Sequence, residues 1–160
     1  MKSDKGTTLL ELLLALGLTG MVMAGLITAF WFTLFSFNRE ITESDIKYAA
    51  RQGRERIIKD FRSSEGFSIQ DAAANEMPMG QEGQRLHLIK TVENVDYYAN
   101  NNQLYRDSSL SSPEPVSENI PDIKFINPVP GMVKITITSR ADSNNFILRT
   151  TYMSRVDYPN

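Results

Sequence analysis

The chain of 160 residues contains no cysteine and only one histidine. The lack of cysteine excludes a disulfide scaffold, a thiolate metal site and a cysteine nucleophile. The one histidine, His87, alternates with Leu86 and Leu88, which predicts an exposed or interfacial side chain rather than a catalytic one. No P-loop, G-x-S-x-G or H-E-x-x-H pattern occurs. These absences favour a structural protein over an enzyme, with no cofactor and no metal.

Charge is balanced over most of the chain and missing from one long stretch. The formal net charge is −2, and without a basic excess we expect no nucleic acid as a direct partner. The 27 residues from Leu12 to Asn38 carry no charge. As a helix they would span about 40 Å, whereas a bilayer core measures about 30 Å. The run is too long for a cleaved secretory signal peptide, so we expect a retained membrane anchor.

Two lysines precede the uncharged run and predict its orientation. Lys2 and Lys5 are the basic residues of the N-terminal segment, and no charge follows Glu11 until Arg39. Positive residues stay on the cytoplasmic side of a membrane. We therefore expect a single-pass membrane protein, with its N-terminus on the cytoplasmic side and its head outside.

The uncharged run also has a face of small residues. Gly17, Gly20, Ala24 and Thr28 recur at steps of three and four, and Gly25 and Ala29 begin a second face. Small residues let helices approach closely in lipid, which predicts helix–helix packing. The alternative is that glycine and alanine are simply common in membrane helices.

Glu11 is the one carboxylate at the start of the apolar run. A charge deep in a bilayer costs about 2.5–3.5 kcal/mol, so such residues usually have a partner. One candidate is the α-amine that cleavage after Gly6 would create on Thr7, on the same chain or on a neighbour. The alternative is an interfacial glutamate that favours a helix N-terminus through the helix dipole.

The helical pattern continues beyond the membrane and then changes to alternation. A stripe at steps of three and four comprises Ile46, Ala50, Gly53, Ile57 and Phe61. Pairs four apart on the solvated faces are expected at Arg51–Glu55, Glu55–Lys59 and Arg56–Asp60. Gly53 on the stripe predicts close approach by another element. We expect the helix to stop at 63–66, with Gly66 as its cap.

Alternating apolar residues after Gly66 predict strands. They lie around residues 85–89, 95–99, 104–106, 123–125, 133–137 and 146–152, with a turn in the segment ANNNQ. Residues 71–84 and 108–121 are expected to be loops. The tyrosines are attributed to sheet packing and the loop aspartates and asparagines to turns, in preference to nucleic acid and calcium.

Together these patterns predict an α+β fold. A long N-terminal helix, with a transmembrane half and an amphipathic half, packs its stripe against an antiparallel β-sheet head. The expected boundaries are a leader at 1–6, the transmembrane helix at 7–38, its soluble half at 39–65 and the head at 66–160.

The N-terminus resembles a known family. Lys5-Gly6 followed by Thr7-Thr8-Leu9-Leu10-Glu11 and the apolar run to Phe37 is similar to the signal of type IV pilins and pseudopilins. The resemblance implies that a prepilin peptidase cuts between Gly6 and Thr7 and methylates Thr7. It also implies that Glu11, at mature position five, serves assembly, and that other major or minor pilin subunits are partners.

The head resembles particular members of that family. The hairpin VDYY…QLYRD is followed by DIKFI, MVKITIT and FILRTTYMSRV, with Arg155 near the end. This order is similar to W-type minor pilins and to the J-type minor pseudopilin of type II secretion. The resemblance implies a role in adhesion, motility, DNA uptake or type II secretion, without distinguishing among them.

The sequence departs from the family at two places. Thr7 stands where the first mature residue is usually Phe or Met, and no proline occurs before Pro78. Major pilins often carry a proline near mature position 22, which is Thr28 here, so a minor subunit is favoured. A major pilin and a signal-anchored extracytoplasmic binding or sensory module stay as alternatives.

Overall fold

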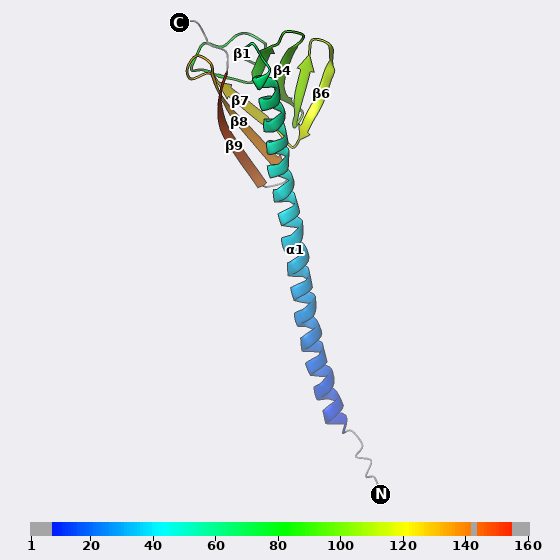
Figure 1. Cartoon of the computed structure of the whole chain (residues 1–160). Coiled ribbons are helices and arrows are strands. Elements are labelled where there is room, and N and C mark those ends of the chain that lie inside the picture. Colours follow the sequence, from blue (N-terminus) through cyan, green and yellow to red (C-terminus); the bar gives the residue numbers. More distant parts are fainter. Residues whose placement is uncertain (1–7, 142–143, 155–160) are drawn as a thin grey trace. The chain divides into compact units, whose positions relative to one another are not determined.

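The computed structural model describes residues 8–141 and 144–154 and contains one helix followed by nine strands (Figure 1). Helix α1 spans Leu9–Arg62. The strands are β1 (Gly66–Gln70), β2 (Glu82–Gly83), β3 (Arg85–Ile89), β4 (Asn94–Asn100), β5 (Gln103–Ser108), β6 (Ser111–Glu118), β7 (Asp122–Ile126), β8 (Met132–Ala141) and β9 (Asn144–Met153). The chain divides into two compact units, Met1–Ile41 and Thr42–Asn160.

The strands of the second unit form two antiparallel sheets. Sheet A has the order β1-β3-β4-β5-β6, and sheet B has the order β2-β7-β8-β9. The α+β class predicted from the sequence is confirmed, but the head contains two sheets where one was expected. The sequence could not separate them, because alternation fixes which residues share a face and not which strands are neighbours.

The last third of α1 packs against both sheets of the head. Its buried residues are Ile46, Ala49, Ala50, Gly53, Ile57, Ile58, Asp60 and Phe61. The Ser117 hydroxyl on β6 donates to the Ala49 carbonyl at 2.9 Å, and the Ser139 hydroxyl on β8 donates to the Ile46 carbonyl at 2.8 Å. The predicted apolar stripe therefore covers the core, as its period indicated.

Gly53 lies where α1 closely approaches β5. A Cβ atom placed there would lie 2.8 Å from Leu104 Cδ2, 3.4 Å from Ile120 Cδ1 and 3.9 Å from Ile137 Cδ1. These contacts confirm the close approach predicted from the sequence. A larger residue at this position would have to displace the Leu104 side chain on β5.

A two-residue turn joins β4 to β5, as the ANNNQ segment predicted. Asn101 and Asn102 have φ angles of 48° and 63°. Two consecutive residues in the left-handed region match the tight hairpin turn whose twist suits the flanking strands, and asparagine tolerates that region well. The turn fixes the register in which Tyr98 pairs with Tyr105.

The helix ends without the glycine cap expected at Gly66. Helix α1 stops at Arg62, and Gly66 instead begins β1. The Ser63 hydroxyl donates to the Asp60 carbonyl at 3.0 Å, and the Ser64 hydroxyl donates to the Phe61 carbonyl at 2.8 Å. The backbone N–H groups of Ser63 and Ser64 donate to the same two carbonyls at 3.2 and 3.3 Å, so serine backbone and side chains together satisfy carbonyls of the last turn.

Three strands lie where no strand was predicted. Strand β6 occupies most of the expected loop 108–121, β2 lies inside the expected loop 71–84, and β1 follows the helix directly. In β6 five consecutive residues are exposed, and its pairing with β5 shifts register twice. It is an edge strand, where Pro113 and Pro115 are tolerated, and it lacks the alternation that reveals a half-buried strand.

We expect Gly53→Val to lower the free energy of unfolding by about 1–3 kcal/mol, because the added atoms overpack the contact with Leu104 and Ile120. Gln52→Val is the matched control, since it puts the same β-branched residue at an exposed position of the same helix. Denaturant unfolding of the full chain in detergent measures both. Equal stability of the two variants would contradict the close approach.

Candidate functional site in helix α1

The first half of α1 is an apolar surface with no cover from the rest of its unit. Residues 8–35 are all exposed. An 18-residue window of this helix has a mean hydropathy of 2.1 and no buried residue. By length and composition the segment can cross a membrane, so a single-pass anchor is compatible with it.

Thr8 and Glu11 cap the start of the helix through two reciprocal hydrogen bonds. The Glu11 backbone N–H donates to Thr8 Oγ1 at 3.3 Å, and the Thr8 N–H donates to Glu11 Oε2 at 3.4 Å. Since α1 begins at Leu9, Thr8 is the N-cap residue and Glu11 is the third residue of the helix. This is a capping box, whose sequence signal is Thr-x-x-Glu.

The capping box gives Glu11 a role within its own chain. The sequence had offered the helix dipole as the local explanation, and the two hydrogen bonds are a more specific form of the same idea. The predicted cleavage site, Gly6 and Thr7, lies outside the described residues. The pairing of Glu11 with an amine on Thr7 therefore stays a prediction.

Three threonines in the apolar segment satisfy their hydroxyls internally. Thr19, Thr28 and Thr33 each donate to the carbonyl four residues earlier, at 2.8, 2.8 and 2.9 Å. In lipid such a hydroxyl has no water to bond, so a bond to the helix backbone removes the cost of exposing it. These residues can lie in hydrocarbon without a partner helix.

The small-residue face lies on this exposed surface. A Cβ atom at Gly17 or Gly20 would meet nothing within 4 Å. With Ala24 and Thr28 at steps of four, these residues form one side of the helix, wide enough for another backbone to approach. The face is present as the sequence predicted, and the packing of a second helix on it stays a prediction.

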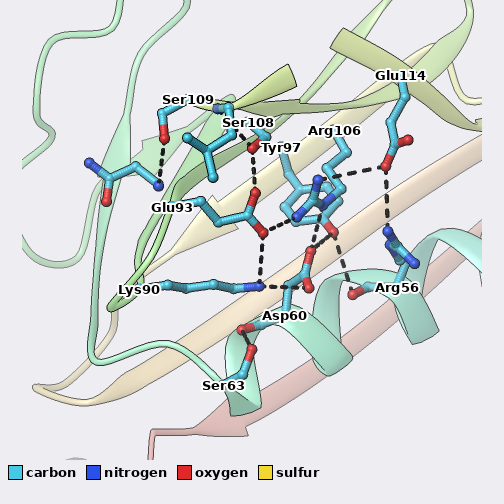
Figure 2. A network of polar contacts seen from close by, with 12 residues as sticks. Arg56, Asp60, Ser63, Lys90, Glu93, Tyr97, Arg106, Ser108, Ser109 and Glu114 are labelled. Carbon is cyan, nitrogen blue, oxygen red and sulfur yellow. Dashed lines mark hydrogen bonds and ion pairs between the residues drawn. The ribbon is translucent and has the colours of Figure 1, made fainter. Parts of the chain in front are cut away.

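The other end of α1 carries a polar network that the sequence did not predict (Figure 2). Asp60 Oδ2 accepts from Arg106 Nε at 2.8 Å and from the Tyr97 hydroxyl at 2.5 Å. Asp60 Oδ1 accepts from Lys90 Nζ at 2.8 Å. The side chains of Asp60 and Arg106 are only 10% and 9% exposed. One carboxylate of the last helical turn thus binds the β3–β4 turn, β4 and β5.

Acidic residues complete the network around the buried arginine. Glu93 Oε1 lies 2.7 Å from Arg106 Nη2 and accepts its hydrogen bond, while Glu93 Oε2 accepts from the Ser108 hydroxyl. Glu114 on β6 lies 3.7 Å from Arg106 Nη1 and 3.4 Å from Arg56 Nη2. The positive and negative charges balance, which is how buried ionised groups are tolerated.

The network lowers the pKa of Asp60 to about 2. Burial alone would raise this pKa, but the hydrogen bonds from Arg106, Lys90 and Tyr97 favour the charged form and outweigh burial. The pKa of Tyr97 is raised, because burial and the neighbouring Asp60 carboxylate both disfavour the phenolate. Tyr97 therefore remains a hydrogen-bond donor and Asp60 an acceptor at neutral pH.

These contacts correct the ion pairs that the sequence predicted on the helix surface. The predicted pair Arg56–Asp60 does not form, since Asp60 faces the core and Arg56 contacts Glu114. Glu55 contacts Arg54 in place of the predicted Arg51 and Lys59. A signal for the buried carboxylate was present, because Asp60 directly precedes Phe61 of the apolar stripe and Arg106 alternates in phase with Leu104.

The remaining candidate residues have partners within the head. His87, predicted to be exposed or interfacial, is partly buried on β3, with Nδ1 2.6 Å from Asp96 Oδ1. Asp71 accepts from the backbone N–H groups of Ala73 and Asn75, which is the turn chemistry expected of it. Among the described residues no group of three or more histidine, aspartate or glutamate side chains could hold a metal ion.

We expect Asp60→Asn to cost about 3 kcal/mol of unfolding free energy at neutral pH, because Arg106 and Lys90 lose their buried counter-charge. The folded pKa of about 2 lies below the ordinary value of 3.8. The contribution is therefore complete above about pH 4 and is lost as the pH falls towards 2.

Denaturant unfolding of both proteins from neutral to acidic pH measures this difference. Asp45→Asn is the control, since Asp45 is exposed on the same helix. A gap between wild type and Asp60→Asn that stayed constant down to pH 2 would contradict the network as the cause.

Comparison with known proteins gives no relative: no family model, no curated protein and no solved structure matches this chain.

Proposed function

We propose that the chain is a minor pilin or pseudopilin, a structural subunit that prepilin peptidase processes and that joins, or initiates, a type IV pilus-like filament. The observation that carries this proposal is the first half of α1. Thr8 and Glu11 cap its first turn, it carries no charge from Leu12 to Asn38, it exposes all its side chains over residues 8–35, and it continues into an α+β head. The Gly6-Thr7 junction four residues before Glu11 supplies the processing signal.

The proposed mechanism begins in the cytoplasmic membrane. Lys2 and Lys5 keep the leader inside, and the apolar segment holds the precursor until the leader is removed. Cleavage turns Thr7 into a cationic N-terminus, and methylation of its amine retains the charge. The Glu11 carboxylate of a neighbouring subunit then attracts this amine, which offsets the cost of placing both charges in an apolar bundle.

Helix packing and head contacts would complete assembly. Residues 7–38 would pack into the filament core, where the face of Gly17, Gly20, Ala24 and Thr28 permits a neighbouring backbone to approach. The head would contact sibling subunits. The chain's partners are thus the peptidase, the membrane and other pilin subunits.

A second candidate function is a signal-anchored extracytoplasmic binding or sensory module. The capping box favours it, because it explains Glu11 without any partner subunit. A plain membrane anchor would use the same two hydrogen bonds. Cleavage after Gly6 and the need for a charge at Glu11 are the properties that separate the two candidates.

We expect co-expression with a prepilin peptidase to remove Met1–Gly6 and to add one methyl group to Thr7, as measured by intact mass. A Gly6→Val variant is the matched control and should keep the precursor mass, because the bulky side chain blocks the cut. An unchanged mass for the natural sequence, with a control pilin processed in the same cells, would refute the proposal.

We expect Glu11→Gln to reduce incorporation into filaments about tenfold or more, because a neutral side chain loses a charge-assisted hydrogen bond to the amine. Glutamine still accepts from the Thr8 N–H, so this variant keeps the capping box that Glu11→Ala loses. The measurement is the protein's abundance in sheared filaments relative to the membrane fraction. Normal incorporation of Glu11→Gln beside failure of Glu11→Ala would leave only the capping role.

A further inference from the structure

We propose that the aromatic residues between Phe30 and Phe37 form a girdle that binds the lipid headgroup region on the outer side of the membrane and sets the depth of α1. The proposal rests on the membrane anchoring of the proposed function, and is independent of cleavage and filament assembly. Its members are Phe30, Trp31, Phe32, Phe35 and Phe37, which are between 60% and 73% exposed.

Along the helix axis, these rings lie only at one end of the apolar segment. Residues 8–29 contain no aromatic side chain, and the next charges after the rings are Arg39 and Glu40. Tryptophan gathers where a membrane helix leaves the hydrocarbon, because its flat amphipathic ring suits the headgroup level, and the apolar phenylalanine rings beside it suit the hydrocarbon just below that level. The rings therefore mark the end of the span nearest the head.

Around the helix axis, the rings point in several directions, unlike the residues of a packing stripe, which share one face. Consecutive helical residues point about 100° apart, so Phe30, Trp31 and Phe32 point in three directions. Trp31 and Phe35 follow Thr28 at steps of three and four and continue the small-residue face, whereas Phe30 and Phe37 lie on the opposite side. Close packing of a second helix on the small face therefore ends at Thr28, where large rings begin.

The spacing from Glu11 matches the thickness of a bilayer. Twenty residues separate Glu11 from Trp31, which is about 30 Å of helix and equals the hydrocarbon thickness of about 30 Å. With Trp31 at the outer interface, the capping box at Thr8 and Glu11 lies at the inner one. Glu11 then stays near the headgroups and avoids the larger cost of a charge at the bilayer centre.

Trp31 is the only tryptophan of the chain, so its fluorescence reports on one position. The full-length precursor is reconstituted in phosphatidylcholine vesicles whose acyl chains carry bromine near the headgroup, in the middle or near the tail. We expect the strongest quenching from bromine near the headgroup. In a Trp31→Phe, Met21→Trp variant, which moves the probe midway to Glu11, we expect the strongest quenching from bromine near the tail.

A Phe30→Leu, Phe32→Leu, Phe35→Leu variant tests the girdle as a unit, with Trp31 as the reporter. We expect its strongest quenching to shift towards deeper bromine. The proposal is overturned if wild-type Trp31 is quenched most by tail bromine, if no bromine quenches it although the protein floats with the vesicles, or if the triple variant shows no shift. Failure of the precursor to float with vesicles at all would overturn the membrane anchor itself.

Discussion

Helix α1 satisfies its own backbone hydrogen bonds, and both units of the chain depend on that property. In hydrocarbon no water is available, so a spanning segment must pair every interior N–H and carbonyl within itself. In the head the same geometry places every third or fourth residue on the apolar stripe that covers the core. Only the ends lack helical partners. Thr8 and Glu11 serve one end, and Ser63 and Ser64 serve the other.

The Asp60 network fixes the position of the helix against sheet A, whereas apolar packing alone would only require contact. A buried ion pair adds little net stability beyond what an apolar replacement would give, since desolvation offsets most of the attraction. Its geometric demands are strict, however, because Arg106, Lys90 and Tyr97 must all reach one carboxylate. Together with the Ser139–Ile46 hydrogen bond to sheet B, this arrangement specifies one register of the helix. We interpret the network as a device for specificity.

The periodicity of apolar residues predicted the helix and most of the strands. It could not predict contacts between segments that are distant in the sequence. The helix stripe, the β4–β5 turn and the strands around Leu86, Tyr97, Ile123, Ile135 and Leu148 follow from steps of three to four or of two. Strand β6 was not predicted, because an exposed edge strand with two prolines has no apolar alternation. Asp60 was assigned to the solvated surface because a sequence does not reveal which charge finds a buried partner 46 residues away. The capping box was not predicted although Thr-x-x-Glu is a local pattern, because the helix dipole alone also explains a glutamate in the first turn.

The local and the intermolecular role of Glu11 are physically compatible. A carboxylate has two oxygens and about four acceptor sites. Among the described residues, the capping box uses Oε2 alone, at 3.4 Å. Oε1 is therefore left to accept from an amine on a neighbouring helix while the first turn stays capped. A glutamate held in one orientation by its own helix loses less side-chain entropy when it binds that amine. At the membrane interface, the capping box would thus preorganise the carboxylate for assembly. Glu11 can therefore cap its own helix and bind a neighbouring amine at the same time.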